Sequence, residues 1–505
     1  MTSPADAPSH PALSHHFAEN FPELSLAHTG RPTRAPHLLT LNAPLATELG
    51  LDPDWLATEN GLRFLTGEAP GPDARPVAQG YAGHQFGGYS PVLGDGRALL
   101  LGELTTPDGR LTDLHLKGSG RTAYARPGAD GMAAVGPMLR EHVISEFLHA
   151  AGAPSTRTLA VVGTGDTIQR ETPRPGAVLA RTASSHLRVG SFQLAAALDH
   201  QRAHDDAAPA RSLVARLVDE ALARHEPGVD VSTLTDAERA ETLLAGVIRR
   251  QAELVAQWML LGFVHGVMNT DNMTISGESI DFGPCAFMEA FDLATVFSSI
   301  DRQGRYAYAQ QPGIAQWNLT RFAETLLPLL SDVPDDAVAS AETALREFRG
   351  HHSAAWSAGL RAKLGLGAPG TADVESEGRA RKGVSDEQLG QLTDELFGLL
   401  AEHAVDWTSF WADLAEDVVP PGLQDWHARW AELDPVRAVM RRTNPRIIPR
   451  NHVLDAALES AEAGDLSEVQ RILAAVADPY TAAAGDADLT RPASGTGRFV
   501  TYCGT

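Results

Sequence analysis

A short polar segment near the middle of the chain, HGVMNTDN at residues 265–272, most constrains the fold. It is followed by Asp281-Phe282-Gly283, which begins nine residues after Asn272. Asn272 and Asp281 both offer the oxygen ligands that suit Mg²⁺, a cation that takes few protein ligands and completes its shell with water and phosphate. The two segments are therefore candidates for two loops that meet around a metal ion.

The two segments resemble the catalytic loop and the metal-binding loop of protein kinases. In kinases the first loop carries His-Arg-Asp and, five residues later, Asn; its Asp accepts the substrate proton, while the Asn and the Asp of DFG hold metal ions. Here Val267 stands where the loop Asp belongs. A valine can neither accept a proton nor orient a hydroxyl. The chain is therefore either catalytically inactive or performs different chemistry with the same nucleotide.

Composition and charge exclude several classes of protein. The chain has 505 residues, of which 43% are hydrophobic, so we expect a two-lobed catalytic unit with terminal additions. The 41 basic and 64 acidic side chains give a net charge of −23, which argues against nucleic acid or anionic membranes as partners. A local arginine cluster with a metal ion could still bind ATP.

Compartment and membrane contact follow from the cysteine count and the apolar stretches. Two cysteines cannot make a disulfide framework, and the N-terminus lacks the pattern of a signal peptide, so we expect a cytoplasmic protein. The most apolar stretch, residues 254–268, is interrupted by Gln257 and His265 and is too short to span a bilayer.

The order of patterns along the chain predicts an α+β protein of the kinase-like, bilobal type, with a small sheet-rich N-lobe and a larger helical C-lobe. We expect a disordered N-terminus at 1–16, an N-terminal extension at 17–80, the N-lobe at 81–190, the helical C-lobe at 191–430, and C-terminal helices with a redox-active tail at 431–505.

Turn signals and helix caps predict the main elements. Gly94-Asp95-Gly96 and Pro107-Asp108-Gly109 separate short apolar runs, which indicates an antiparallel sheet. The clearest helix begins at Thr235, which forms a capping box with Glu238, and ends near Gly262. Other helices are predicted at 137–151, with Gly152 as its stop, at 315–327, 340–349 and 388–403, and two short ones within 453–476. A short strand is predicted at 263–264, just before the polar loop.

Lys117 and Glu141 are candidates for an ion pair in the active site. Lys117 ends a strand-like run and Glu141 lies inside the helix that follows. Kinase-like folds use such a pair to aim an ammonium group at nucleotide phosphates, because the pair fixes a long side chain. A Lys and a Glu at this spacing could also be surface charges. Since Lys, Glu, the loop Asn and DFG occur in kinase order, we favour the functional interpretation.

Glycines and arginines provide candidate phosphate contacts. The segments 94–96 and 118–120 each have two glycines around one residue, so backbone amides could approach an anion there, although a hairpin turn is the more common role of each segment taken alone. Arg97, Arg181 and Arg188 suit bidentate phosphate contacts. A solvated or carboxylate-paired arginine is the commoner outcome.

Asp271 is the only carboxylate within the polar loop. If a substrate hydroxyl must lose a proton, Asp271 is the available base. An Asp that caps the loop in an Asx-turn is the equally weighted alternative.

Cys285 follows the DFG segment by two residues, and Cys503 lies third from the C-terminus. Two unrelated thiols are the simpler interpretation. A reversible disulfide between them could instead tie the tail to the active site.

With these residues assembled, the chain resembles the selenoprotein O family of kinase-like protein adenylyltransferases. The resemblance covers nearly the whole chain and is carried by FAENFPEL, YAGHQFGGYSPVLGDGRA, LKGSGRTAYAR, DGMAAVGPMLREH, LARTASSHLRVGSFQ, HGVMNTDNM, DFGPCAFM and TYCGT. It implies that ATP binds in the reverse orientation to that in kinases. AMP is then transferred to Ser, Thr or Tyr hydroxyls of proteins, and pyrophosphate leaves.

The resemblance also implies roles for individual residues. Asp271 corresponds to the proton acceptor, Asn272 and Asp281 to the metal ligands, and Glu141 to the partner of Lys117. Cys285 and Cys503 correspond to a regulatory disulfide, although this chain has Cys503 near the position where animal members carry the more reactive selenocysteine. The implied nucleotide contacts are Gly94, Gly96, Arg97, Lys117, Asp130, Gly131, Arg181, Arg188 and Asp281.

We therefore predict a monomeric, metal-dependent protein adenylyltransferase that uses ATP with Mg²⁺ or Mn²⁺. Some family members are associated with Mn²⁺ and uridylylation, so a uridylyltransferase using UTP stays open. Val267 favours a pseudokinase scaffold without turnover, whereas the retained Lys117, Asn272 and Asp281 argue against it. A true kinase with Asp271 as base is a further alternative. A thiol oxidoreductase is another, but the chain lacks a Cys-X-X-Cys arrangement.

Overall fold

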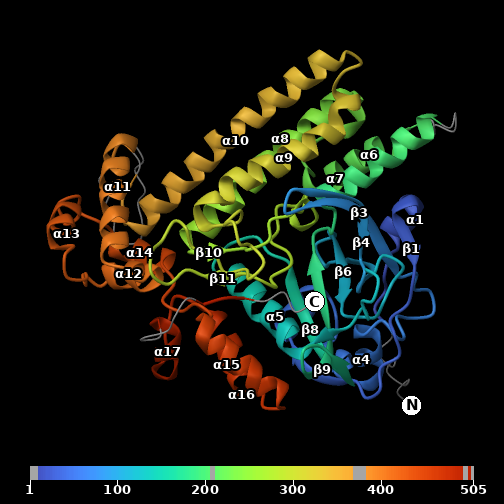
Figure 1. Ribbon diagram of the computed structural model, residues 1–505, viewed down its shortest axis with the longest axis horizontal. Coiled ribbons are helices and arrows are strands. Elements are labelled where there is room, and N and C mark those ends of the chain that lie inside the picture. The colour runs from blue at the N-terminus through green and yellow to red at the C-terminus, as the bar shows by residue number, and fades with distance from the viewer. Residues whose placement is uncertain (1–9, 205–210, 368–382, 493–498, 502–505) are drawn as a thin grey trace, which may run out of the picture.

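The computed structural model describes residues 10–204, 211–367, 383–492 and 499–501. Its strands gather on one side of the molecule and its long helices on the other (Figure 1). The predicted α+β class is confirmed. Within the described residues, no helix is both long enough and apolar enough to cross a membrane.

An antiparallel sheet forms the first side. In the described part of the chain it has nine strands in the order β1-β3-β5-β6-β9-β8-β2, with β4 paired to β3 and β7 paired to β9. A turn at residues 95–97 joins β4 to β5, and a hairpin turn at residues 106–110 joins the paired strands β5 and β6, where the glycine signals predict turns. The strands are β1 (Ser25–Ala27), β2 (His37–Leu41), β3 (Val77–Gln85), β4 (Gly88–Gly94), β5 (Ala98–Thr105), β6 (Leu111–Lys117), β7 (Ala133–Ala134), β8 (Arg157–Gln169) and β9 (Pro173–Ala183).

The alternation of β6 decides where its polar residues lie. Leu114 and Leu116 enter the hydrophobic cluster formed with the helices α2 (Ala43–Glu48), α3 (Pro53–Leu56) and α4 (Glu59–Leu65). Because successive strand residues point to opposite faces, His115 and Lys117 lie on the other face, with α5 (Val135–Ala150). The sequence therefore places Lys117 on the α5 side of the sheet.

Segment 17–80 supplies strands at both edges of the sheet, in addition to helices that pack on one face. β1 pairs with β3 at one edge, and β2 pairs with β8 at the other. Order also begins before residue 17, contrary to the expectation of disorder over 1–16. The buried Glu103 carboxylate accepts the backbone N–H groups of His16 and Phe17, each at 2.9 Å, and so holds the start of α1 (His16–Asn20).

The helix predicted at 137–151 is α5, and its stop at Gly152 is confirmed by a positive φ of 82°. α5 packs against β8 and β9 on one side and against α15 (Asn451–Glu462) and α16 (Ser467–Val476) on the other. α15 and α16 are the two short helices predicted within 453–476. The C-terminal part of the chain therefore supports the helix that carries Glu141.

Long helices form the second side. α8 (Asp236–Leu260) has the predicted capping box at Thr235 and Glu238 and packs against α9 and α10. α9 and α10 are longer than the helices predicted at 315–327 and 340–349. α10 buries few side chains, so its sequence has a weak apolar period and its full length could not be predicted. The remaining helices on this side are α6 (Val189–His204), α7 (Leu213–His225), α9 (Gln311–Leu330), α10 (Pro334–Lys363), α11 (Asp386–Glu402), α12 (Trp407–Leu414), α13 (Gln424–Ala431), α14 (Arg437–Thr443) and α17 (Ala487–Thr490).

Candidate active site

A two-stranded ribbon brings the two sequence motifs together. β10 (Phe263–Val264) follows α8 and pairs antiparallel with β11 (Ala286–Phe287). The polar loop 265–272 leaves β10, and the DFG segment enters β11, so both motifs start from the same ribbon. His265 is buried and its Nε2 lies 2.8 Å from the Ile280 carbonyl oxygen. Burial lowers the pKa of this imidazole, which therefore stays neutral and ties one loop to the other.

Three charged side chains gather around Asp281. Lys117 contacts the Glu141 carboxylate and donates a hydrogen bond to Asp281 Oδ1 at 2.6 Å. Arg181 on β9 lies 3.2 Å from the same oxygen and 3.9 Å from Glu141 Oε2. Lys117, Glu141 and Arg181 are buried. The structure thus contains the ion pair of Lys117 and Glu141 that the sequence order predicts, and joins it to the DFG carboxylate.

The electrostatic environment keeps Asp281 ionised. Burial alone would raise its pKa, but the positive charges of Lys117, Arg181 and Arg188 hold that pKa well below its usual range. Asp281 also adopts a left-handed backbone conformation, with φ at 64°. This conformation is uncommon for a residue other than glycine and clusters at functional sites. The chain accepts local strain to present this carboxylate.

Asn272 completes a pair of oxygen groups that suits a divalent cation. It lies in the 3₁₀ turn Thr270–Asn272, and its Nδ2 donates to the Val267 carbonyl at 3.1 Å, which fixes the amide. Within the described residues no group of three or more His, Cys, Asp or Glu side chains could hold a metal ion. A cation held by Asn272 and Asp281 would therefore take its other ligands from water and phosphate, as Mg²⁺ commonly does.

Asp271 is buried beside β3. Its Oδ2 accepts a hydrogen bond from Gln85 Nε2 at 3.0 Å, and its buried Oδ1 has no partner among the described residues. Burial raises the pKa of this carboxyl group, with Gln85 and Arg188 acting in the opposite direction. Arg188 donates to the main-chain oxygen of Asp271 at 3.2 Å and stacks on the Tyr81 ring at 4.4 Å.

The hairpin of β3 and β4 holds the polar loop from the sheet side. The His84 N–H donates to Thr270 Oγ1 at 2.7 Å, and the Phe86 N–H donates to Asn269 Oδ1 at 3.1 Å. A Cβ at Gly83 would lie 3.1 Å from Asp271 Oδ1, so a larger residue would crowd the carboxylate. Sequence reasoning missed Gln85 as a partner of Asp271. The glycine-rich run YAGHQFGGYS indicates that another part of the chain comes close to this backbone, but it does not identify that part.

The glycines of the segment 94–96 have a structural use in this chain. A Cβ at Gly94 would lie 2.5 Å from the Tyr124 ring, and one at Gly96 would lie 3.0 Å from the Ala125 Cα. Between them, Asp95 Oδ2 accepts from the Gln79 N–H at 3.1 Å and lies 3.0 Å from His115 Nε2. The turn is therefore anchored below by Asp95 and covered by the loop that follows β6.

That covering loop contains Asp130 and Gly131, two more of the predicted nucleotide contacts. Asp130 forms an ion pair with Arg170 at 2.8 Å, and its Oδ1 accepts the Met132 N–H at 2.9 Å. Gly131 has a positive φ of 73°, and a Cβ there would lie 2.2 Å from the Arg121 nitrogen. The Arg97 carbonyl accepts the Gly118 N–H at 2.7 Å, next to Lys117. The structure thus places Arg97 beside Lys117, whereas Asp130 is engaged by Arg170.

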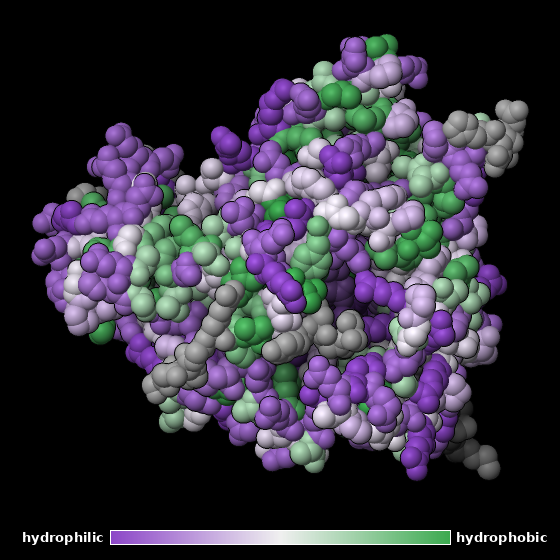
Figure 2. All heavy atoms as spheres, viewed as in Figure 1, coloured by the Kyte–Doolittle hydropathy of each residue, from purple (hydrophilic) through white to green (hydrophobic). Residues whose placement is uncertain are grey.

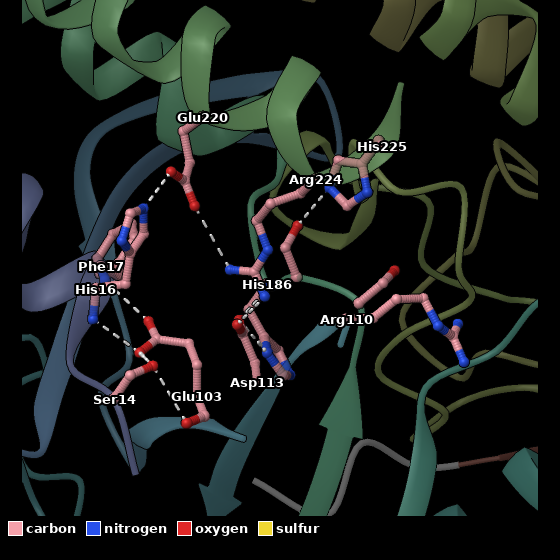
Figure 3. Close-up of polar contacts among 12 residues, drawn as sticks. Ser14, His16, Phe17, Glu103, Arg110, Asp113, His186, Glu220, Arg224 and His225 are labelled. Carbon is pink, nitrogen blue, oxygen red and sulfur yellow. Dashed lines mark hydrogen bonds and ion pairs between the residues drawn. The ribbon is translucent and has the colours of Figure 1, made fainter. Parts of the chain in front are cut away.

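A buried network fixes β6 from the side opposite α2–α4 (Figure 3). Asp113 accepts the His186 N–H at 2.8 Å and pairs with Arg224 of α7 at 2.7 Å. Burial lowers the pKa of His186 to about 3, so its ring is neutral and stacks on His115 at 4.2 Å. Arg224 also lies 3.7 Å from Glu220. The strand that carries Lys117 is therefore bound to a helix of the second side.

Cys285 is a buried thiol whose pKa burial raises to about 12. Its Sγ donates to the Phe282 carbonyl at 3.1 Å. The C-terminal segment passes beside this loop, because Thr501 Oγ1 donates to the Pro284 carbonyl at 2.7 Å. Cys503 lies outside the described residues, so the disulfide between the two cysteines stays a prediction.

Comparison with known proteins shows the family of the chain. The family model described as protein adenylyltransferase SelO matches residues 13–428. The chain belongs to the SelO family. The protein nucleotidyltransferase YdiU of Mycolicibacterium paratuberculosis is 52% identical over 512 residues, which cover 98% of each chain. That of Pseudarthrobacter chlorophenolicus is 50% identical over 518 residues, which cover 99% of this chain and all of the relative. The predicted family is thus confirmed, and with it the class of nucleotidyltransferases.

Proposed function

We propose that this SelO-family chain is a protein adenylyltransferase that moves AMP from ATP to hydroxyl groups of Ser, Thr or Tyr on proteins. The observation that carries the proposal is the Asp281 carboxylate, which stays ionised between Lys117 and Arg181 and lies in the loop next to a buried candidate base. The family description names adenylyl transfer to protein, and the relatives are named protein nucleotidyltransferases.

The cations of the site account for phosphate binding. Lys117 and Arg181 are fixed on adjacent strands and share Asp281, and Arg188 is buried beside Asp271. Held side chains neutralise phosphate charge without reorganising during the reaction, which is the main requirement of phosphoryl and nucleotidyl transfer. A divalent metal at Asn272 and Asp281 would supply further charge neutralisation when bound.

Asp271 supplies the proton transfer. Its carboxylate takes the proton from the acceptor hydroxyl, whose oxygen forms a bond to the α-phosphorus of ATP. The bond from that phosphorus to the bridging oxygen of the β-phosphate breaks, and pyrophosphate leaves. A raised pKa makes Asp271 a stronger base than an exposed aspartate, because the buried carboxylate gains more from accepting a proton.

The proposed roles extend to the rest of the predicted set. We propose Gly94, Gly96, Arg97, Asp130 and Gly131 as further nucleotide contacts on the strength of the family resemblance. We also propose that the sheet and helical sides correspond to the two lobes of a kinase-like fold. This is supported by the order of a strand Lys, a helix Glu, the polar loop and DFG.

The test is transfer from ATP labelled separately on the α- and γ-phosphates. Covalent α-label on protein, with none from the γ-position, is the expected result. Asp281→Ala should remove the transfer, whereas the matched exposed change Asp332→Ala should not. Transfer of γ-label alone would indicate a kinase. A rise in Tm with ATP and no transfer of either label would indicate a binding scaffold.

The same experiment with UTP decides the nucleobase. The relatives are named nucleotidyltransferases, without a base, so the choice of AMP rests on the family description. We expect α-labelled ATP to outcompete UTP with Mg²⁺ and with Mn²⁺. Preferred transfer from UTP would identify the protein as a uridylyltransferase, and the proposed roles of Asp271 and Asp281 would stay the same.

A further inference from the structure

An exposed aromatic and basic surface lies beside the polar loop. We name it the hairpin surface and define it by Phe86, Tyr89 and Val92 of the β3–β4 hairpin with Arg305 and Trp317. The three hairpin side chains are 38%, 48% and 63% exposed. Single exposed apolar residues are ordinary, but several on one short hairpin are a feature of interaction sites. Figure 2 shows hydrophobic residues in this region, next to a hollow lined by hydrophilic ones.

Ring contacts join the aromatic residues of this surface to one another. The Phe86 ring lies 5.1 Å from Tyr306, and the Tyr89 ring lies 4.9 Å from His84. The His84 ring in turn meets Trp317 of α9 at 5.2 Å. The hairpin surface therefore bridges the sheet side and the helical side of the molecule.

The hairpin surface is joined directly to the loop that carries Asp271. Asn269 Oδ1 accepts from the Phe86 N–H at 3.1 Å and from the Tyr306 hydroxyl at 2.7 Å. Gln85, the residue before Phe86, donates to Asp271. The hairpin surface is thus linked to the candidate base through Gln85 and Asn269.

The charge of the hairpin surface is positive in a chain that is strongly acidic. Arg305 lies over the Trp317 ring at 5.0 Å and takes part in none of the ion pairs among the described residues, whereas Arg321 on the same ring pairs with Glu324 at 2.6 Å. Arg126 is exposed and its side chain donates to Gln85 Oε1 at 2.9 Å, again without a carboxylate among the described residues. Burial lowers the pKa of His84, and the charges of Arg321 and Arg305 lower it further. Most other arginines of the sheet and helices pair with Asp or Glu, so this surface has charge left for an acidic partner.

The strand edge itself is poorly suited to pair with another strand. β4 has β3 as its strand neighbour, and the register shifts between Tyr81 and Gly83, where Pro91 and Val92 form a bulge opposite Ala82. Proline lacks an N–H donor, and a bulge interrupts the ladder, so both features oppose strand addition. Recognition on the hairpin surface must come from side chains.

We propose that the hairpin surface binds the segment of the protein substrate that carries the acceptor hydroxyl, and that this segment has apolar and acidic side chains next to the hydroxyl. Apolar side chains would cover Tyr89 and Val92, and a carboxylate would pair with Arg305. The hydroxyl would then lie toward Asp271. The inference rests on the proposed transfer to protein hydroxyls and adds where and how the acceptor is recognised.

The experiment uses the full chain, α-labelled ATP and synthetic peptides that each contain one Tyr. One peptide has Glu and Leu around the Tyr, the second has Lys and Leu, and the third has Glu and Ser. We expect KM to be about tenfold lower for the first peptide than for the others, because only it offers both an apolar contact and a carboxylate.

Two variants separate acceptor recognition from nucleotide binding. Val92→Glu and Arg305→Glu should each raise KM for the Glu-Leu peptide about tenfold, and Arg305→Glu should reverse the preference toward the Lys-Leu peptide. The rise in Tm caused by ATP should be unchanged. Val418→Glu and Arg349→Glu are matched controls, because both side chains are exposed and belong to segments far along the chain. If Arg305→Glu does not fold, Arg305→Gln still tests the loss of charge.

Several results would overturn the inference. Equal KM for the three peptides in all variants would exclude recognition here. Loss of the ATP-induced rise in Tm in Arg305→Glu would assign the guanidinium to the nucleotide instead. A wild-type dimer that Val92→Glu dissociates would make a second copy of this chain the occupant. If the wild type labels proteins but no peptide, the docking inference fails alone; if it labels neither, the proposed function fails with it.

Discussion

Replacement of Gln85 by Leu tests the link between the hairpin and the base. Gln85 Nε2 donates to Asp271 Oδ2 at 3.0 Å, and the other carboxylate oxygen has no partner among the described residues. A hydrogen bond to a charged group contributes about 1.5–3 kcal/mol. Gln85 is only partly buried, so we take the lower value, about 1.5 kcal/mol. At 1.36 kcal/mol per pKa unit, its loss raises the pKa of Asp271 by about one unit.

The sign of the effect follows from the role of the base. Asp271 acts only when deprotonated, so transfer falls as the pH drops through its pKa, and a higher pKa moves this fall to higher pH. We expect the acidic limb of kcat/KM in Gln85→Leu to shift by about one pH unit, with the rate recovered above it. The assay is α-label transfer across the pH range, with the exposed Gln316→Leu as control. An unshifted limb in a folded variant that still binds ATP would refute the assignment of Asp271 as base.

Three further substitutions test the supports of the site. Asp113→Asn should lower the free energy of unfolding by about 3 kcal/mol, because the buried Arg224 loses its partner at 2.7 Å and keeps only Glu220 at 3.7 Å; thermal unfolding measures this, with the exposed Asp108→Asn as a near-neutral control. Folding lowers the pKa of Asp113. Its contribution to the free energy of unfolding is therefore complete above the usual aspartate pKa and is lost as the pH falls toward the lowered pKa. Glu103→Gln should release the start of α1, seen as faster proteolysis before residue 25. Glu141→Gln should reduce transfer at least about tenfold, although Lys117 still donates its hydrogen bond to Asp281. Full activity of this variant would show that the ion pair of Lys117 and Glu141 is dispensable.

Local patterns in the sequence predicted the parts of the fold that depend on local physics. The capping box at Thr235, the stop at Gly152 and the ribbon strand at residues 263–264 all occur where the patterns place them. Lys117 and Glu141 could be paired from their order, because a strand followed by a helix that packs on the same sheet has few arrangements.

The contacts that could not be predicted join residues far apart in the chain. Gln85 and Asp271 are 186 residues apart, and Glu103 meets Phe17 across 86 residues. Neither contact leaves a periodic pattern, because each depends on how whole elements dock. For the same reason, the sequence did not predict that residues 10–16 are ordered. Its hydrogen-bond acceptor lies on β5.

The valine in the polar loop has a structural explanation once the hairpin is considered. Val267 is buried, and its carbonyl accepts a hydrogen bond from the Asn272 side chain, so the position serves packing and the orientation of the proposed metal ligand. The carboxylate of the loop is four residues later, at Asp271, where β3 reaches it through Gln85. A base that is held from the sheet side approaches the nucleotide from a different direction than a base held within the loop. The exchange of Asp for Val at 267 is therefore consistent with attack at a different phosphate, and restoring an aspartate there by Val267→Asp should add a buried charge and lower the Tm rather than create kinase activity.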